Sequence, residues 1–99
     1  MKLVYPVVFT MMDRGLLVYV PNLDINTFGN NLLDAIEMAR DAISLWCVCQ
    51  EDNGVPLPTP SEISEVERKE GEIVTLVDID TAKYRRMLDS TTSAMDIGA

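Results

Sequence analysis

Short apolar runs separated by turn residues open the chain. Residues 4–12 (VYPVVFTMM) and 16–21 (LLVYVP) are rich in β-branched and aromatic side chains, and a turn signal lies between them at 13–15. This pattern predicts a β-hairpin. Residues 25–28 (INTF), which end at Gly29, predict a third, shorter strand. Apolar side chains fall on both faces of the first strand, so we expect some cover on both faces.

The spacing of apolar residues changes to a helical period at Asn31. Asn31, followed by Asp34 three positions later, resembles a capping box in which the Asn31 side chain can accept a hydrogen bond from an exposed backbone N–H. This favours a helix start at Asn31, and Asn53 with Gly54 ends the helix. The apolar positions of this helix span an arc of roughly 200°, whereas covering one sheet face needs little more than ~100°. The helix therefore has more apolar surface than its own sheet requires.

The surplus lies on one flank of the helix, at Met38, Ala42, Leu45 and Cys49. Such a surplus predicts contact with a second element or with a second subunit. The remaining arc is polar, and we interpret it as a solvated face in which Glu37 can pair with Arg40. Its members are Asp34, Glu37, Arg40, Asp41 and Ser44.

Residues 55–72 (VPLPTPSEISEVERKEGE) combine repeated prolines with many charges, which predicts an exposed connector. This connector is either a plain surface loop or an arm that clasps a partner. Residues 73–80 (IVTLVDID) alternate between two faces and predict a strand that joins the sheet. Asp80 can then cap a short helix over residues 81–89, whose apolar edge contains Tyr84, Met87 and Leu88.

The element order β-β-β-α-β-α predicts an α+β fold. We expect a three- to four-stranded mixed or antiparallel sheet with one long helix across it and a short C-terminal helix. A chain of 99 residues has room for one core, so residues 1–88 are expected to form a single domain. Residues 89–99 are expected to form a flexible C-terminal tail.

Charge and residue chemistry limit the possible functions. The net charge is −8, from 16 acidic against 8 basic residues, which disfavours direct nucleic-acid binding and favours a basic partner. Histidine is absent, and Cys47 and Cys49 point to nearly opposite sides of the helix, so we expect no metal site, no cofactor and no cysteine–histidine catalysis. Free thiols, and the lack of a signal peptide or a long apolar run, predict a cytoplasmic protein with no membrane contact.

The alternative to a binding protein is an enzyme, a nuclease that holds two Mg²⁺ ions between carboxylates. Asp13, Glu37 and Asp78 occur in a suitable order along a strand, a helix and another strand. However, Glu37 falls on the polar arc and Asp13 on the hairpin turn. We therefore expect no catalytic residue and no enzymatic activity.

The hairpin and helix together resemble a known family. Tyr5-Pro6 leads to Tyr19-Val20-Pro21-Asn22-Leu23, then to Thr27 and Gly29-Asn30, and then to a helix with Leu32, Ala35, Ala39-Arg40 and Ala42 to Trp46. This order is similar to the N-terminal domain of HicB antitoxins, in which an aspartate usually stands where Asn22 stands here. The prolines at 56–60 and the stretch IVTLVDIDTAKYRR also resemble longer members, so the likeness covers residues 4–88.

The resemblance implies a truncated ribonuclease H-like fold without nuclease activity that binds a small, basic, RNA-cleaving HicA toxin. Many HicB proteins also carry a C-terminal operator-binding segment, but no Lys or Arg follows Arg86 here. Direct nucleic-acid binding by this chain is therefore not expected. As toxin-binding residues we expect the polar hairpin tip and strand-end loop: Asp13, Arg14, Asn22, Asp24 and Asn26.

The surplus apolar surface of the long helix leads to a further expectation, a homodimer or tetramer. Its contacts would come from the helix flank and from the short final helix, at Met38, Ala42, Leu45, Tyr84 and Met87. The alternative to an antitoxin is a stand-alone oligomeric domain of the same fold with another binding function.

Overall fold

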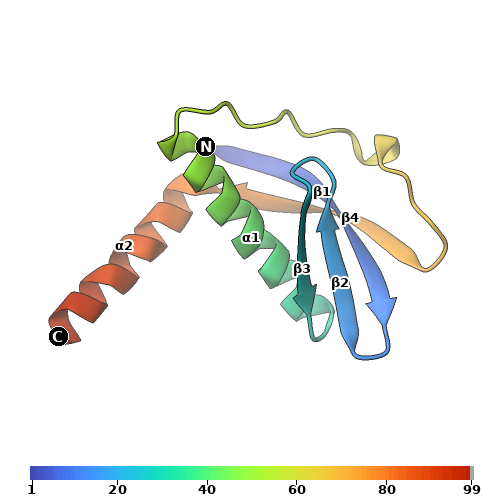
Figure 1. The fold of residues 1–99 in the computed structure, drawn as a ribbon, viewed down its shortest axis with the longest axis horizontal. Coiled ribbons are helices and arrows are strands. Elements are labelled where there is room, and N and C mark those ends of the chain that lie inside the picture. Colours follow the sequence, from blue (N-terminus) through green and yellow to red (C-terminus); the bar gives the residue numbers. More distant parts are fainter. Residues whose placement is uncertain (99) are drawn as a thin grey trace.

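The protein forms one four-stranded antiparallel sheet with a long helix packed on one face (Figure 1). The computed structural model describes the backbone of residues 1–98 and the side chains of residues 1–89. The elements in chain order are β1 (Lys2–Met12), β2 (Gly15–Val20), β3 (Ile25–Gly29), α1 (Leu32–Asp52), the 3₁₀ turn η1 (Ile63–Glu65), β4 (Glu72–Asp80) and α2 (Thr81–Gly98). The strands lie in the order β3-β2-β1-β4. The expected α+β fold and element order are confirmed, and the sheet is antiparallel throughout.

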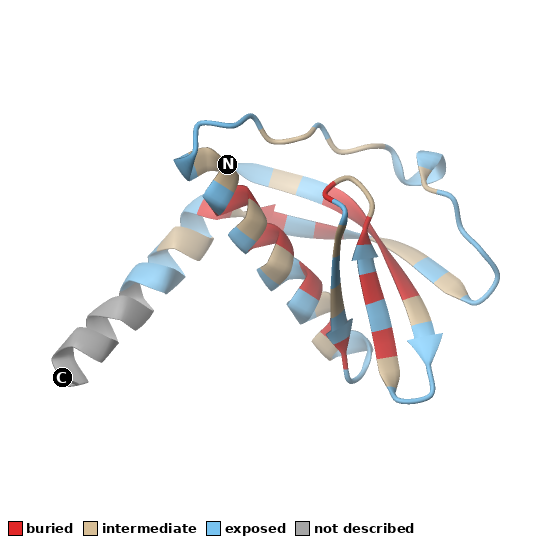
Figure 2. Cartoon of the chain, viewed as in Figure 1, coloured by how far each residue is buried: buried red, intermediate tan, exposed pale blue. Residues whose placement is uncertain are grey.

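The core lies between α1 and the face of the sheet that α1 covers (Figure 2). Alternate strand residues point toward the helix, as the pleat of a strand requires. The central strand β1 contributes Tyr5, Val7 and Phe9, all with no exposed surface. From α1, small residues at helical spacing let the helix approach the sheet closely, and the buried ones include Ala35 and Ala39.

The ends of α1 follow from local hydrogen bonds. The backbone N–H of Asp34 donates to Asn31 Oδ1 at 2.9 Å, which confirms the expected cap. The Asp34 carboxylate accepts from the N–H of Asn30, one residue before the cap. Gly29 stands directly against this first turn, because a Cβ added there would lie 2.4 Å from the backbone of Ala35. At the other end, Asn53 caps the helix as the sequence predicts.

The connector between α1 and β4 is fastened to the rest of the molecule. The Tyr5 hydroxyl donates to the carbonyl oxygen of Pro58 at 2.7 Å, and both the N–H and the Oγ of Ser61 donate to Asn22 Oδ1 at 3.2 Å. Leu57 packs against the core. Val8, on the face of β1 away from α1, is only 6% exposed. The expected cover on both faces of β1 is thus confirmed.

Two expectations about the helices need correction. The backbone of α2 stays helical to Gly98, so α2 is longer than the short helix expected over residues 81–89. The polar arc of α1 is not simply a solvated face, because Ser44 is buried and Arg40 pairs with Asp78 of β4 rather than with Glu37. The physical reason is that β4 and α2 both pack against this side of α1. Over the part of the chain that the structure describes, no helix is long and apolar enough to cross a membrane.

Candidate functional site

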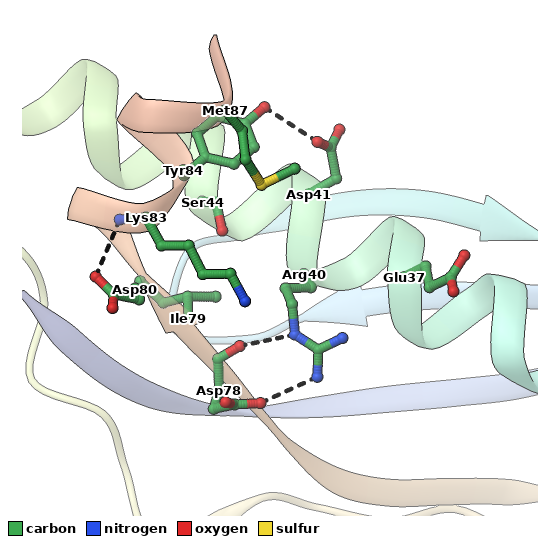
Figure 3. A pocket seen from close by; sticks show the side chains of 10 residues that line it. All are labelled: Glu37, Arg40, Asp41, Ser44, Asp78, Ile79, Asp80, Lys83, Tyr84 and Met87. Atoms are coloured by element: carbon green, nitrogen blue, oxygen red, sulfur yellow. Dashed lines mark hydrogen bonds and ion pairs between the residues drawn. The ribbon is translucent and has the colours of Figure 1, made fainter. Parts of the chain in front are cut away.

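A cleft of about 380 Å³ opens where α1, the end of β4 and the start of α2 meet (Figure 3). Its wall combines charged side chains with a few apolar ones. We call it the α1–α2 cleft, and its lining residues are Glu37, Arg40, Asp41, Ser44, Asp78, Ile79, Asp80, Lys83, Tyr84 and Met87. The cleft exists because β4 runs directly into α2, which places the first turns of α2 beside the polar arc of α1.

Arg40 joins α1 to the outer edge of the sheet on one side of the cleft. Its Nε donates to the backbone carbonyl of Asp78 at 3.1 Å, and its Nη2 donates to Asp78 Oδ1 at 3.0 Å. The planar guanidinium makes these bonds from two separate nitrogens, whereas a lysine would have to make both from its single ammonium nitrogen. The hydrogen bond from Arg40 lowers the pKa of the Asp78 carboxyl below its usual value, because it stabilises the ionised form.

The opposite side of the cleft comes from the first turns of α2. Asp80 caps this helix as expected, because its Oδ1 accepts from the backbone N–H groups of Ala82 at 3.1 Å and of Lys83 at 3.3 Å. The bond from Lys83 is the main reason that the pKa of Asp80 is lowered. One turn further on, the Tyr84 hydroxyl donates to Asp41 Oδ1 at 3.0 Å. Burial, and then this bond, raise the pKa of Tyr84.

A second cluster holds α2 against the end of α1. Arg85 forms ion pairs with Glu51 at 3.1 Å and with Asp52 at 3.0 Å, and its Nη2 also donates to the carbonyl oxygen of Val48 at 3.4 Å. A cation near the last carbonyl groups of a helix also interacts favourably with the helix dipole. Arg85 therefore joins the first turns of α2 to the C-terminal end of α1.

The five residues expected to bind a toxin do not form one cluster. Asp13 and Arg14 lie in the β1–β2 turn, whereas Asn22 and Asp24 lie in the β2–β3 turn and Asn26 is the second residue of β3. The two groups are at opposite ends of the six-residue strand β2, roughly 20 Å apart.

Between these two groups runs a line of exposed apolar side chains on the sheet face away from α1. Leu17 and Phe28 are opposite each other on β2 and β3, and Tyr19 is opposite Asn26. Leu17, Tyr19 and Phe28 are 45%, 37% and 42% exposed. The Tyr19 hydroxyl donates to Asp24 Oδ1 at 3.0 Å. We call Leu17, Tyr19 and Phe28 the β2–β3 strip.

The residues expected to make oligomer contacts divide between two surfaces. Met38 and Leu45 are exposed on α1, and Ala42 between them is half-buried. Tyr84 and Met87 belong to α2 and line the α1–α2 cleft. The hydrogen bond between Tyr84 and Asp41 shows that α2 approaches α1 on its polar arc, so the apolar flank keeps its exposed side chains.

The three carboxylates weighed for metal-dependent cleavage are also separated. Glu37 and Asp78 both line the cleft, but Asp78 is opposite Val4 on β1, whereas Asp13 follows the far end of that strand, roughly 30 Å away. Among the residues that the structure describes, no three His, Cys, Asp or Glu side chains are grouped so that they could hold a metal ion. Cys47 is buried and Cys49 exposed, as their spacing predicts.

The cleft itself was not predicted from the sequence. Its residues come from three elements whose mutual approach depends on the pairing of β4 with β1 and on the direction of α2. The sequence held one signal for the cleft: Tyr84 and Met87 gave the last helix an apolar edge, which predicts that this helix packs against another part of the molecule.

Comparison of the fold points to one class of protein. A chain in the structure of a toxin–antitoxin complex from Streptococcus pneumoniae superposes with a TM-score of 0.75 at 19% identity, covering 85% of this chain and 73% of that chain. A chain in the structure of the HicA3 and HicB3 toxin-antitoxin complex superposes with a TM-score of 0.65 at 26% identity, covering 79% of this chain and 99% of that one. No curated protein sequence matches the chain.

The sequence gives the family. Residues 5–94 match the model of the HicB-like antitoxins of bacterial toxin–antitoxin systems. The chain belongs to this family, which confirms the resemblance found in its hairpin and long helix.

Proposed function

We propose that this protein is the antitoxin of a bacterial toxin–antitoxin pair and acts by sequestering a small, basic, HicA-type toxin in the cytoplasm. The observation that carries the proposal is the family match over residues 5–94. The net charge of −8 supports it, because a strongly acidic protein attracts a basic RNA-cleaving protein and speeds their encounter. Binding, rather than catalysis, is the role that we assign to the chain.

The surface that we assign to the toxin is the β2–β3 strip with the polar residues at its two ends. Exposed apolar side chains beside carboxylates give an interface both a dry centre and an acidic rim. Asp24 and Asn26 border the strip at one end, and Asp13 and Arg14 lie at the other. Asn22 holds Ser61 of the connector and so contributes to the shape of this end rather than to its exposed rim.

We also propose that the protein forms a homodimer, or a tetramer, through the apolar flank of α1. Met38 is 39% exposed and Leu45 is 47% exposed, although α2 packs beside this flank, on Asp41. A stand-alone oligomer with no toxin partner is the alternative that this same flank would support.

Co-expression with a small, basic HicA-type protein tests the antitoxin role. That protein alone should arrest growth, and this chain should relieve the arrest and copurify with it. Leu17→Glu should weaken binding at least tenfold, because it places a charge in the dry centre of the strip. The matched control is Leu76→Glu, which changes another exposed leucine (51%) on the outer face of β4.

Three results would contradict parts of this proposal. Absence of arrest, or arrest without rescue by the unmodified chain, removes the antitoxin role. Equal weakening by Leu17→Glu and Leu76→Glu removes the β2–β3 strip as the contact surface. A binding defect in Leu76→Glu alone moves the contact to β4.

A further inference from the structure

We propose that the α1–α2 cleft binds an alkylammonium or alkylguanidinium group, carried either by a Lys or Arg side chain of a protein or by a free polyamine. The cleft lies on the helix-bearing side of the molecule, whereas the β2–β3 strip lies on the opposite sheet face. The proposal therefore does not depend on where a toxin binds.

The charges around the cleft favour a cation. The lining includes four carboxylates but only two basic side chains, Arg40 and Lys83. Arg40 is already committed to Asp78, and its two hydrogen bonds hold it against the β4 edge. Glu37 takes part in none of the hydrogen bonds or ion pairs of the described residues and is exposed. Glu37 lies at the outer edge of the cleft, and in Figure 3 its carboxylate points away from Arg40 and Asp78, so it can add negative charge at the mouth.

Ser44 provides a second and independent reason to expect a polar ligand. Its side chain lines the cleft, although the residue is only 3% exposed. The hydrogen bonds of the described part of the chain do not involve its hydroxyl, and no fully enclosed side-chain N or O atom there lacks a partner. The hydroxyl thus faces the cleft space, where its oxygen can accept an N–H from a bound cation.

The apolar part of the wall suits the methylene chain of such a ligand. Ile79, Tyr84 and Met87 contribute carbon and sulfur surface beside the carboxylates. Long cationic side chains commonly lay their methylene groups on apolar surface while the charged head reaches polar groups. A cation near the Tyr84 ring also gains from the negative face of the aromatic system. The volume of about 380 Å³ is at the small end for ligand pockets, which fits a single extended chain.

Lys83 allows a test of the sign of the ligand's charge. Its side chain extends into the cleft in Figure 3, and its charge contributes to lowering the pKa of Asp78. It therefore repels an incoming cation, whereas Glu37 attracts it. Lys83→Met should tighten binding about threefold, and Glu37→Gln should weaken it about threefold, which are the effects of single exposed charges. For an anionic ligand, Lys83→Met would weaken binding and Glu37→Gln would strengthen it.

Amide chemical shifts of the ¹⁵N-labelled protein, followed during titration at constant ionic strength, test the proposal. The probes are agmatine, putrescine, a blocked Gly-Gly-Arg-Gly-Gly peptide and, as an anion, glutarate. Saturable shifts are expected for agmatine at amides of residues 37–44 and 78–84, with millimolar affinity and none with glutarate. The matched control Glu67→Gln removes an exposed carboxylate from the connector and should leave the affinity unchanged.

The results of this titration distinguish a protein side chain from a free polyamine as the ligand, and they show whether the cleft binds cations at all. Binding of the peptide as tightly as agmatine identifies a protein side chain as the ligand, and binding of agmatine and putrescine without the peptide identifies a polyamine. No saturable shifts at these amides, similar shifts with glutarate, or equal effects of Glu37→Gln and Glu67→Gln would overturn the proposal. No toxin is needed, so such a failure leaves the proposed antitoxin role standing.

Discussion

At the scale of single residues, the buried contact between Tyr5 and Cys47 makes stability depend on pH. Burial raises the pKa of Cys47 to about 11, helped by the nearby charge of Glu51. Burial and the neighbouring Cys47 raise the pKa of Tyr5 to about 12. Both groups are neutral when protonated, so the folded state holds their protons more tightly than the unfolded state does.

This contact predicts a loss of stability in alkaline solution. The stabilisation from Cys47 is complete below pH 9, the ordinary pKa of a thiol, and is lost as the pH rises toward about 11. We expect the free energy of unfolding to fall by roughly 2 kcal/mol between pH 8 and pH 11, less than the sum of the two shifts because the groups interact. Urea titrations across this range measure it.

Tyr5→Phe provides the control for the alkaline loss. It removes one of the two titrating groups and also the hydrogen bond to Pro58, so its stability at pH 8 should be lower. Its further loss between pH 8 and pH 11 should be smaller than that of the unmodified protein. A pH dependence identical in both proteins would show that the contact does not produce the effect.

The sequence predicted the role of a residue where that role depends only on its neighbours in the chain. Asn31 and Asp80 were predicted as caps, because a cap needs only the few residues that follow it. Ser44 was placed on a solvated face, because a helical period says which residues share a side but not what lies against that side. Arg40 was paired with Glu37 for the same reason, since its partner Asp78 is distant in the sequence.

At the scale of elements, the strands and α1 were predicted well, and α2 was not. The strands and α1 have strong hydrophobic periods between clear turn or cap signals. The second half of α2 begins with four Ser and Thr residues (90–93), which have lower helix propensity, so its length could not be predicted from local preference. Its attachment to α1 depends instead on contacts that the sequence pattern does not reveal.

The attachment of α2 to α1 should depend on Arg85. We expect Arg85→Met to raise the hydrogen-exchange rates of α2 backbone amides roughly fivefold, because it removes two partly exposed ion pairs and a contact with the C-terminal end of α1. Exchange measured by mass spectrometry reports this change. Arg86→Met is the matched control, since Arg86 is exposed and takes part in none of the ion pairs among the described residues. Equal rates in both variants would contradict the role of Arg85.

For the whole molecule, net charge opposes self-association, whereas exposed apolar surface favours it. Two copies of a chain with net charge −8 repel each other, whereas the proposed basic toxin would be attracted to either copy. Salt screens both effects. Self-association through an apolar flank should therefore strengthen with added salt, and toxin binding should weaken. These opposite dependences distinguish the two kinds of contact without any knowledge of their detailed geometry.

Sedimentation of the purified protein at about 50 mM and about 500 mM NaCl tests the dimer through this difference in sign. We expect the dimer to dissociate at low salt and to be stable at high salt. Leu45→Glu should give a monomer at both salt concentrations, because it buries an unpaired carboxylate in the interface. Leu33→Glu makes the same change at a residue of α1 that is 67% exposed and lies off the Met38–Leu45 flank, so it should still dimerise. A monomer at high salt and micromolar concentration, or equal behaviour of the two variants, would mean that the flank of α1 does not join two copies.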